Sequence, residues 1–309
     1  MSASRINVLV TGYGNIGTPI LKALTSSEFS ERIRTFVLIR PASLSDPRKK
    51  AAIDQVRALN GVTVLEGDLE AGVPALTAVL KAAAIHTVVG VVGGLQIAQQ
   101  LPLVKAAKAA GVRHFIPSEF GVDSEATPID GLWGPFVHAK KEVATAVKAA
   151  GLDYSLLYVG VFTEFLVGYT IGGVDLQRGM VAAPGSWQAR VTTTPIEEAA
   201  WLTAAAVVDP QARNATLYSG ETVTYQQLAD MVDAARGKPV ERRIRTVDEA
   251  HKAVEANTND FAARLVSVLA DGRGASWPAS NNYSTKFHPK HKPHTLAEWI
   301  NANVKPAGQ

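Results

Sequence analysis

The chain has 309 residues, with 31 Lys and Arg against 28 Asp and Glu, a formal charge of +3 and no cysteine. This near-neutral balance does not favour nucleic acid as a partner, because nucleic-acid binding requires basic residues concentrated on one face. The lack of cysteine excludes disulfides, thiolate metal sites and a cysteine nucleophile. No apolar run reaches the roughly 18 residues of a membrane span, and the start of the chain lacks a signal-peptide pattern. We therefore expect a soluble, cytoplasmic protein that does not enter a membrane.

The first half of the chain alternates short apolar segments with helical patterns. The apolar segments are rich in β-branched residues and cover 6–10, 35–39, 62–65, 86–92 and 114–117. The helical patterns cover 19–25, 48–59, 76–84, 97–110 and 136–150. Gly111 and Gly151 follow the last two patterns, where each predicts a left-handed helix cap. Repeated strand–helix–strand units predict an α/β fold, a Rossmann-type doubly wound parallel sheet with helices on both faces.

The regular alternation ends after Tyr158. Beyond it, we predict a buried helix over 195–208 and a second helix over 224–236, capped by Thr224 and ended by Gly237. The sequence thus predicts two domains. Residues 1–158 form the sheet domain, and residues 159–309 form a smaller, irregular lobe, part of which packs back on the sheet.

The first predicted strand runs into a glycine-rich turn, Gly12-Tyr13-Gly14-Asn15-Ile16-Gly17. A Gly-x-Gly-x-x-Gly turn between a buried strand and a helix is the fingerprint of dinucleotide binding. In this motif Gly12 allows the tight turn, Gly14 lets the backbone approach a pyrophosphate, and Gly17 lets helix and strand pack closely. Asn15 and Ile16 lead into the helix, whose N–H groups attract phosphate. A glycine turn in some other α/β protein is the alternative interpretation.

The end of the second predicted strand indicates which dinucleotide binds. An NAD enzyme usually places Asp or Glu there to hold the ribose 2′-hydroxyl. This chain has Arg40 instead, with Lys49 nearby in the loop that follows. A guanidinium forms a bidentate pair with a 2′-phosphate, which an acid would repel. NADPH is therefore the predicted cofactor, unless Arg40 is only a solvated strand end.

Motifs spread over nearly the whole chain resemble a known family. They are the Arg40 loop over 38–50, Gly67-Asp68-Leu69, Gln96-Ile97-Ala98 with Gln100, Phe115-Ile116-Pro117-Ser118-Glu119-Phe120-Gly121, and 150–154 with Phe162. Together they resemble the isoflavone reductase-like reductases, which include phenylcoumaran benzylic ether and pinoresinol–lariciresinol reductases, within the NmrA-like group of atypical short-chain dehydrogenases. The resemblance implies NADPH as cofactor and a small aromatic or conjugated molecule as substrate.

The resemblance also implies a catalytic lysine at Lys140, near the start of the helix after the fifth strand. A shift of one residue would place it at Lys141, and both lysines could instead be solvated helix charges. The chain holds no Tyr-x-x-x-Lys pair, so the usual acid of short-chain dehydrogenases is missing. A partly desolvated lysine beside a cationic cofactor ring has a lowered pKa and can work near neutral pH.

Further cofactor contacts follow from the same resemblance. It places Val91, Gly93 and Gln96 along the cofactor and Phe162 against the nicotinamide, although Phe162 also fits an ordinary core position. Pro117 and Ser118 are among these contacts, and Ser118 and Glu119 lie at the carboxyl end of the fifth strand, where open α/β sheets bind ligands.

Three features depart from the family pattern. Thr11 stands where the first glycine normally begins, Gly160 replaces an asparagine two residues before the aromatic Phe162, and the segment between Gly121 and Lys140 matches no plant member known to us. Backbone geometry for the cofactor can survive these changes. The identity of the substrate cannot be transferred across them.

Three histidines, His288, His291 and His294, have a spacing that suggests a metal site. Prolines at 289 and 293 interrupt the helix that would align their rings, and the lysines between and before them repel a cation. We expect a solvated basic loop and no metal. Glu197 and Glu198, at the start of a predicted helix, favour the helix dipole and need no catalytic role.

The sequence therefore predicts an NADPH-dependent reductase that transfers a hydride to an enone, quinone methide or benzylic ether. Lys140 would donate the proton, and the lobe from Gly160 onward would shape the substrate pocket. An NmrA-like NADP(H) sensor without catalysis is the main alternative, and a non-redox enzyme of the same family is a third. Lys140 and Phe162 together favour the reductase. The oligomeric state is not predicted.

Overall fold

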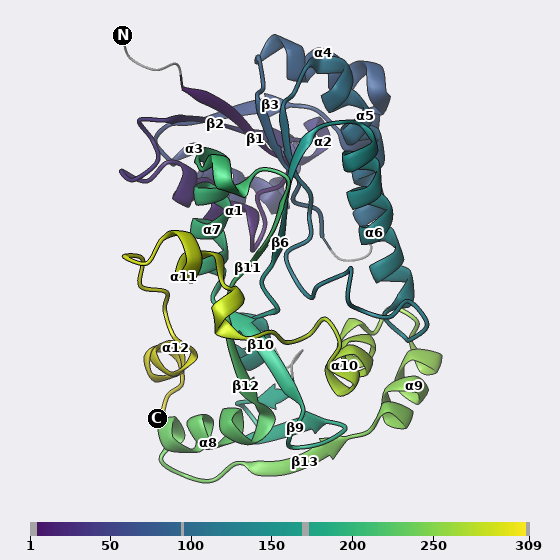
Figure 1. Ribbon diagram of the computed structural model, residues 1–309, viewed down its shortest axis with the longest axis vertical. Coiled ribbons are helices and arrows are strands. Elements are labelled where there is room, and N and C mark those ends of the chain that lie inside the picture. The colour runs from purple at the N-terminus through teal and green to yellow at the C-terminus, as the bar shows by residue number, and fades with distance from the viewer. Residues whose placement is uncertain (1–4, 94–95, 169–172, 307–309) are drawn as a thin grey trace. The chain divides into compact units, whose positions relative to one another are not determined.

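Residues 5–93, 96–168 and 173–306 are described here from a computed structural model (Figure 1). The chain divides into two compact units, of which the first comprises Met1–Glu119, Ala139–Leu157 and Ala199–Leu217, and the second Phe120–His138, Tyr158–Glu198 and Tyr218–Gln309. The division predicted at residue 158 concerns which part binds cofactor and which binds substrate, and it stays a prediction. The two compact units do not follow a boundary at residue 158, since residues 120–138 belong to the second unit and residues 199–217 to the first.

A seven-stranded sheet is the centre of the first unit, in the order β11-β6-β5-β4-β1-β2-β3. The strands are β1 (Ile6–Val10), β2 (Ile33–Ile39), β3 (Val62–Glu66), β4 (Thr87–Val89), β5 (His114–Ile116), β6 (Asp153–Tyr158) and β11 (Ala215–Tyr218). Neighbouring strands from β3 through β6 run parallel, and Leu9 of β1 lies opposite Phe36 on one side and Val88 on the other. The strand order reverses at β1 and β4, where open α/β sheets form a crevice at the carboxyl ends. The predicted Rossmann-type fold is confirmed.

Helices cover both faces of this sheet. They are α1 (Gly17–Leu24), α2 (Pro41–Leu44), α3 (Lys50–Arg57), α4 (Gly72–Ala82), α5 (Gln100–Ala110), α6 (Gly134–Ala149) and α7 (Ile196–Val208), with short helical turns η1 (Pro47–Lys49), η2 (Leu69–Ala71), η3 (Ile97–Gln99) and η5 (Pro210–Ala212). Figure 1 shows α1 and α7 on one side of the sheet and α4, α5 and α6 on the other. Gly111 and Gly151 adopt φ values of 80° and 66°, as the predicted left-handed caps require.

The second unit contains two three-stranded sheets, β12-β10-β7 and β13-β9-β8. The strands are β7 (Val161–Phe162), β8 (Val174–Asp175), β9 (Met180–Pro184), β10 (Arg190–Thr194), β12 (Glu221–Thr224) and β13 (Glu241–Arg245). The helices are η4 (Glu164–Gly168), α8 (Tyr225–Arg236), α9 (Val247–Ala256), α10 (Phe261–Asp271), η6 (Ala279–Asn281), α11 (Tyr283–Phe287) and α12 (Leu296–Asn303). Thr224 accepts a hydrogen bond from the Gln227 N–H and Gly237 ends α8 with φ 68°, so both predicted boundaries of this helix are confirmed.

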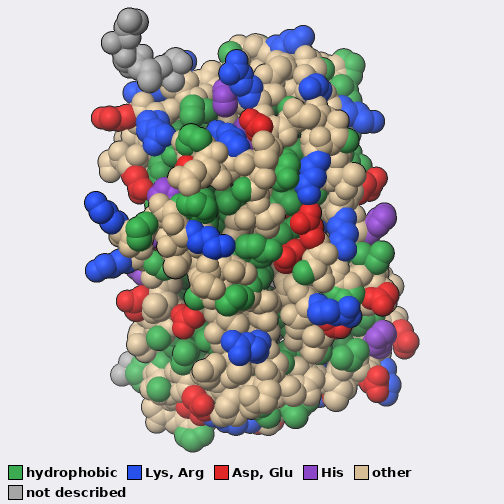
Figure 2. Space-filling model, viewed as in Figure 1, with side chains coloured by type: hydrophobic (Ala, Val, Ile, Leu, Met, Phe, Trp, Pro, Cys, Tyr) green, Lys and Arg blue, Asp and Glu red, His purple; other side chains and the backbone are tan. Residues whose placement is uncertain are grey.

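No helix within the described parts of the chain is long and apolar enough to cross a bilayer. On the face drawn in Figure 2, Lys and Arg side chains are interspersed with Asp and Glu. A mixed surface of this kind does not produce a concentrated field of one sign.

Candidate functional site

The glycine turn is held by close backbone contacts. A Cβ atom added to Gly12 would lie 2.7 Å from the carbonyl oxygen of Val91, and one added to Gly17 would lie 2.1 Å from the carbonyl oxygen of Gly12. Neither glycine has a positive φ. The turn therefore needs glycine at both positions because the chain segments approach closely, and not because of a left-handed backbone.

Gly14 differs from the other two glycines because it faces open space. A Cβ added to it would meet no atom within 4 Å, and Gly14 and Asn15 are both exposed. Helix α1 begins two residues after Asn15, its first turn contains no acidic side chain, and Ile16 at the cap forms no side-chain hydrogen bond. The turn thus leaves room beside the positive end of a helix, where a pyrophosphate fits.

Thr11, the first departure from the family pattern, connects two strand ends. Its hydroxyl accepts a hydrogen bond from the Val91 N–H at 2.8 Å and donates to the Val91 carbonyl at 3.3 Å. Val91 follows β4, which neighbours β1 in the sheet. The threonine therefore fixes the spacing at the switch point with a side-chain bridge that a glycine would not form.

Of three cationic residues in the loop after β2, Arg40, Arg48 and Lys49, the last two have partners within the loop. Arg48 is ion-paired with Asp46 at 3.0 Å, and Lys49 donates to the Ser43 hydroxyl at 3.2 Å. Arg40 is exposed, and within the described residues its guanidinium has no hydrogen bond or ion pair. Arg40 is therefore the cation of this loop that is available to an external anion.

The segment after β4 is partly described. Val91 is half-buried, whereas Gly93 and Gln96 are exposed, and the Gln96 N–H donates to the Gly93 carbonyl at 3.2 Å. A Cβ on Gly93 would meet nothing within 4 Å. The two exposed residues are accessible to a ligand at this edge of the sheet.

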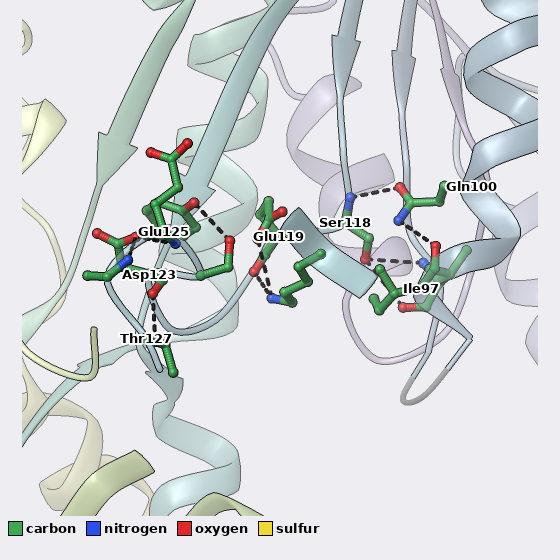
Figure 3. A network of polar contacts seen from close by, with 12 residues as sticks. Ile97, Gln100, Ser118, Glu119, Asp123, Glu125 and Thr127 are labelled. Carbon is green, nitrogen blue, oxygen red and sulfur yellow. Dashed lines mark hydrogen bonds and ion pairs between the residues drawn. The ribbon is translucent and has the colours of Figure 1, made fainter. Parts of the chain in front are cut away.

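Ser118, which follows β5, is part of a buried polar network that also includes Gln100 (Figure 3). The Gln100 side-chain oxygen accepts from the Ser118 N–H at 2.9 Å, and its amide nitrogen donates to the Ile97 carbonyl at 3.2 Å. The Ser118 hydroxyl lies 3.3 Å from the carbonyl oxygen of Val92. Gln100 is fully buried, and a Cβ on Gly90 would lie 2.2 Å from its side-chain oxygen. Sequence reasoning noted Gln100 only as a family match and did not predict that its side chain connects the backbone after β5 with that of Ile97.

Pro117 and Glu119 form the next turn of the chain. The Glu119 N–H donates to the Pro117 carbonyl at 2.7 Å. This bond turns the backbone just beyond the carboxyl end of β5, and Glu119 is 1% exposed.

Lys140 on α6 reaches this buried turn. Its Nζ donates to the main-chain carbonyl of Glu119 and lies 3.7 Å from the Glu119 Oε2. Burial lowers the pKa of Lys140, and the Glu119 carboxylate acts in the opposite direction. Lys140 is 1% exposed, while Lys141 is partly exposed. The interpretation of both lysines as solvated charges is wrong for Lys140, which is the inward-facing member of the pair.

Phe162 and Gly160 belong to the second unit. Phe162 is 5% exposed and packs against Phe165 with ring centroids 5.6 Å apart. Gly160 has φ 67°, and a Cβ there would lie 2.0 Å from the Thr192 carbonyl oxygen. An asparagine does not fit this backbone, so the bend and the close approach of Thr192 explain the glycine without reference to a substrate.

The three C-terminal histidines do not form one cluster. His291 lies 2.8 Å from the buried Glu198 carboxylate, and His288 lies 3.2 Å from the Tyr283 hydroxyl. Across the described residues no group of His, Asp and Glu side chains is arranged to hold a metal ion. The expectation of a solvated loop is wrong for His291, which is partly buried. Glu198 contacts this histidine in addition to lying at the start of its helix.

The chain is similar over most of its length to known proteins. It matches the model of the NmrA-like family over residues 3–300. It is 28% identical to an NmrA-like family domain-containing oxidoreductase of Gibberella moniliformis, covering 88% of this chain and 90% of that protein. It is 26% identical to a phenylcoumaran benzylic ether reductase of Ginkgo biloba, covering 98% of this chain and all of the relative.

Among solved structures, the complex of leucoanthocyanidin reductase with NADPH from Vitis vinifera has the same fold. The TM-score is 0.83 at 22% identity, with 96% of this chain and 99% of that chain covered. The family match spans almost the entire sequence. The chain belongs to the NmrA-like family.

Proposed function

We propose that the protein is an NADPH-dependent reductase of the isoflavone reductase-like type, acting on an aromatic or conjugated small molecule. The observation that carries this proposal is the buried Lys140, paired with Glu119 just beyond the carboxyl end of β5. That sheet edge is also the one at which the glycine turn and Arg40 lie, since β1, β2, β4 and β5 are parallel neighbours. A dinucleotide-binding edge and a buried proton donor are the two parts that a reductase needs.

The residues at the sheet edge fit NADPH. The open space at Gly14 and the uncapped start of α1 have room for the pyrophosphate. The exposed Arg40 would donate hydrogen bonds to the 2′-phosphate, with Lys49 of the same loop as a second cation. We assign further cofactor contacts to Val91, Gly93 and Gln96 after β4, and to Pro117 and Ser118 after β5. When bound, NADPH supplies the hydride. Phe162 as the residue against the nicotinamide stays a prediction.

Lys140 provides the proton. Its Nζ carries a proton that it donates to the oxygen on which negative charge develops in the substrate. Because Lys140 is 1% exposed, the substrate oxygen must enter the fold to come within hydrogen-bond distance of Nζ. The same exclusion of water strengthens the interaction between the ammonium group and a developing oxyanion.

The substrate class is supported by the relatives. The Ginkgo relative is named for reducing a benzylic ether, in which the reacting carbon carries an aromatic ring. We assign cofactor binding to residues 1–158 and substrate binding to residues 159–309. Enones, quinone methides and benzylic ethers share the electrophilic carbon that a hydride requires.

Titration with NADPH and NADH, followed by a screen of phenolic, enone and benzylic ether substrates, tests this function. We expect tighter binding of NADPH than of NADH, and loss of NADPH absorbance with at least one conjugated aromatic compound. Tight NADPH binding without oxidation across the panel would favour the NmrA-like sensor instead. Preference for NADH would contradict the role of Arg40.

A further inference from the structure

The charged groups of Lys140 and Glu119 are buried together. Both residues are 1% exposed, and Nζ lies 3.7 Å from the Glu119 Oε2. Nζ also donates a hydrogen bond to the main-chain carbonyl of Glu119. One residue therefore contacts the lysine through both its backbone and its side chain, which restricts the position of Nζ more than a single ion pair would.

Burial and ion pairing have opposite effects on the lysine. Removal from water favours the neutral amine, whereas a nearby carboxylate favours the ammonium form. Both effects act on the pKa of Lys140, and burial is the larger, so that this pKa lies below its usual value. Without the carboxylate, burial would act alone and the lysine would lose its proton at a lower pH.

The other titratable groups near Lys140 differ from Glu119 in position or burial. On α6, His138 and Glu142 are exposed and Lys141 is partly exposed. On β5 and β6, His114, Asp153 and Tyr154 lie at the beginning of the strands, at the opposite edge of the sheet from Glu119. Tyr158, at the carboxyl end of β6, is buried, and its hydroxyl is hydrogen-bonded to the Ser124 hydroxyl. Glu119 is thus the buried acid at the lysine itself.

We propose that Glu119 is a positioning residue that holds the Lys140 ammonium group in place and in its charged form for proton transfer. This inference rests on the proposed role of Lys140 as the proton donor. In the step, an N–H bond of the ammonium group breaks, its electron pair stays on Nζ, and the proton forms an O–H bond with the substrate oxygen. The neutral amine stays hydrogen-bonded to the Glu119 carbonyl and regains a proton from water after product leaves.

The test compares the pH dependence of turnover in the wild type, Glu119→Gln and Glu119→Asp. Turnover requires the protonated lysine, so it falls as pH rises through the pKa of Lys140. We expect Glu119→Gln to move this basic limb to lower pH by about one unit or more, because the carboxylate charge is lost. Glu119→Asp keeps the charge at a greater distance and should lie between the two. Glu142→Gln, which removes an exposed carboxylate from the same helix, should leave the limb unchanged.

An unchanged basic limb in Glu119→Gln would overturn the inference, even if the variant were less stable, because a purely structural residue alters stability without moving the limb. If Glu119→Gln does not fold, the position of the limb in Glu119→Asp decides.

A measurement without turnover separates this inference from the proposed function. The pH dependence of the Lys140 side-chain ¹³C chemical shift, assigned by comparison with Lys140→Met, reports the protonation of the amine in each variant and needs no reagent to reach the buried Nζ. We expect its midpoint to fall in Glu119→Gln, and equal midpoints in both proteins would overturn the inference. Full turnover in Lys140→Met would instead overturn the role of Lys140 as the proton donor and leave the measured shift of this midpoint standing.

Discussion

The loop that follows β2 and helix α6 each bring a cation to the carboxyl edge of one sheet, and they present these cations in opposite ways. Arg40 is exposed and, within the described residues, not ion-paired. Lys140 is 1% exposed and lies 3.7 Å from a buried carboxylate. An exposed guanidinium keeps a full charge and can bind an anion from solution. A buried, paired lysine has a pKa that its surroundings control, which suits proton transfer. The contrast teaches that burial separates an anion-binding cation from a proton-donating one at the same edge of the sheet.

The largest expected effect is the loss of turnover when Lys140 is replaced. Lys140→Met removes the proton donor, and we expect kcat to fall about 100- to 10,000-fold. The affinity for NADPH, measured by fluorescence titration, should change little because the phosphates bind elsewhere. Lys141→Met is the matched control, with wild-type turnover expected. Equal losses in both variants would mean that the burial of Lys140 has no functional meaning.

The same substitution should also destabilise the fold. Lys140→Met leaves the buried Glu119 carboxylate without its cation, which costs about 3–5 kcal/mol for a buried ion pair. Adding Glu119→Gln removes the buried charge, so the double variant should recover part of the loss. Chemical denaturation of the wild type, both single variants and the double variant measures this coupling. Strictly additive effects would show that the two residues do not stabilise each other.

Replacing the exposed Arg40 should reduce the preference for NADPH over NADH and leave the fold intact. A hydrogen bond to a charged group contributes about 1.5–3 kcal/mol. We therefore expect Arg40→Ala to weaken NADPH binding roughly 10- to 100-fold and to leave NADH binding unchanged. Arg48→Ala is the control, since Arg48 is already paired with Asp46. Parallel losses for NADPH and NADH would argue against a contact with the 2′-phosphate.

Two glycines of the turn should respond differently to alanine. Gly17→Ala forces a Cβ to within 2.1 Å of the Gly12 carbonyl oxygen, so it should lower the free energy of unfolding by about 1–3 kcal/mol. Gly14→Ala meets no protein atom within 4 Å and should keep the stability of the wild type while weakening NADPH binding. Thermal melts with and without NADPH distinguish them. A stable Gly17→Ala protein would contradict the close contact at that position.

The smallest effect is expected for a second buried carboxylate, Glu198, which lies beside His291. Burial raises the pKa of Glu198, although His291 opposes this. Because the pKa of Glu198 is higher in the folded than in the unfolded state, the folded protein binds this proton more tightly. The resulting gain in the free energy of unfolding is complete below the unfolded-state pKa and is lost as pH rises through the folded-state pKa. Relative to Glu198→Gln, the wild type should therefore lose about 1 kcal/mol or less between pH 4 and pH 7. Denaturation curves at both pH values test the sign, and an opposite trend would show that His291 outweighs burial.

The sequence by itself determined the features that depend on local chain properties. Short β-branched segments alternating with helical patterns predicted the sheet, and Thr224 with Gly237 predicted both ends of α8. The spacing of Gly12, Gly14 and Gly17 predicted the dinucleotide turn, and the motifs between Arg40 and Phe162 predicted the family. These signals can be recognised because each one involves residues that are close together in the chain.

Tertiary structure decided which charges are paired and which are exposed. Glu119 and Lys140 are 21 residues apart and Thr11 and Val91 are 80 apart, so no local pattern reveals that they meet. The spacing of His288, His291 and His294 suggested one cluster, whereas folding pairs His291 with Glu198, 93 residues away. Burial, and with it the pKa of a lysine or a carboxylate, depends on all the segments that pack around it. That is why the sequence predicts the cofactor edge well and only the folded chain shows that Lys140, and not Lys141, faces inward.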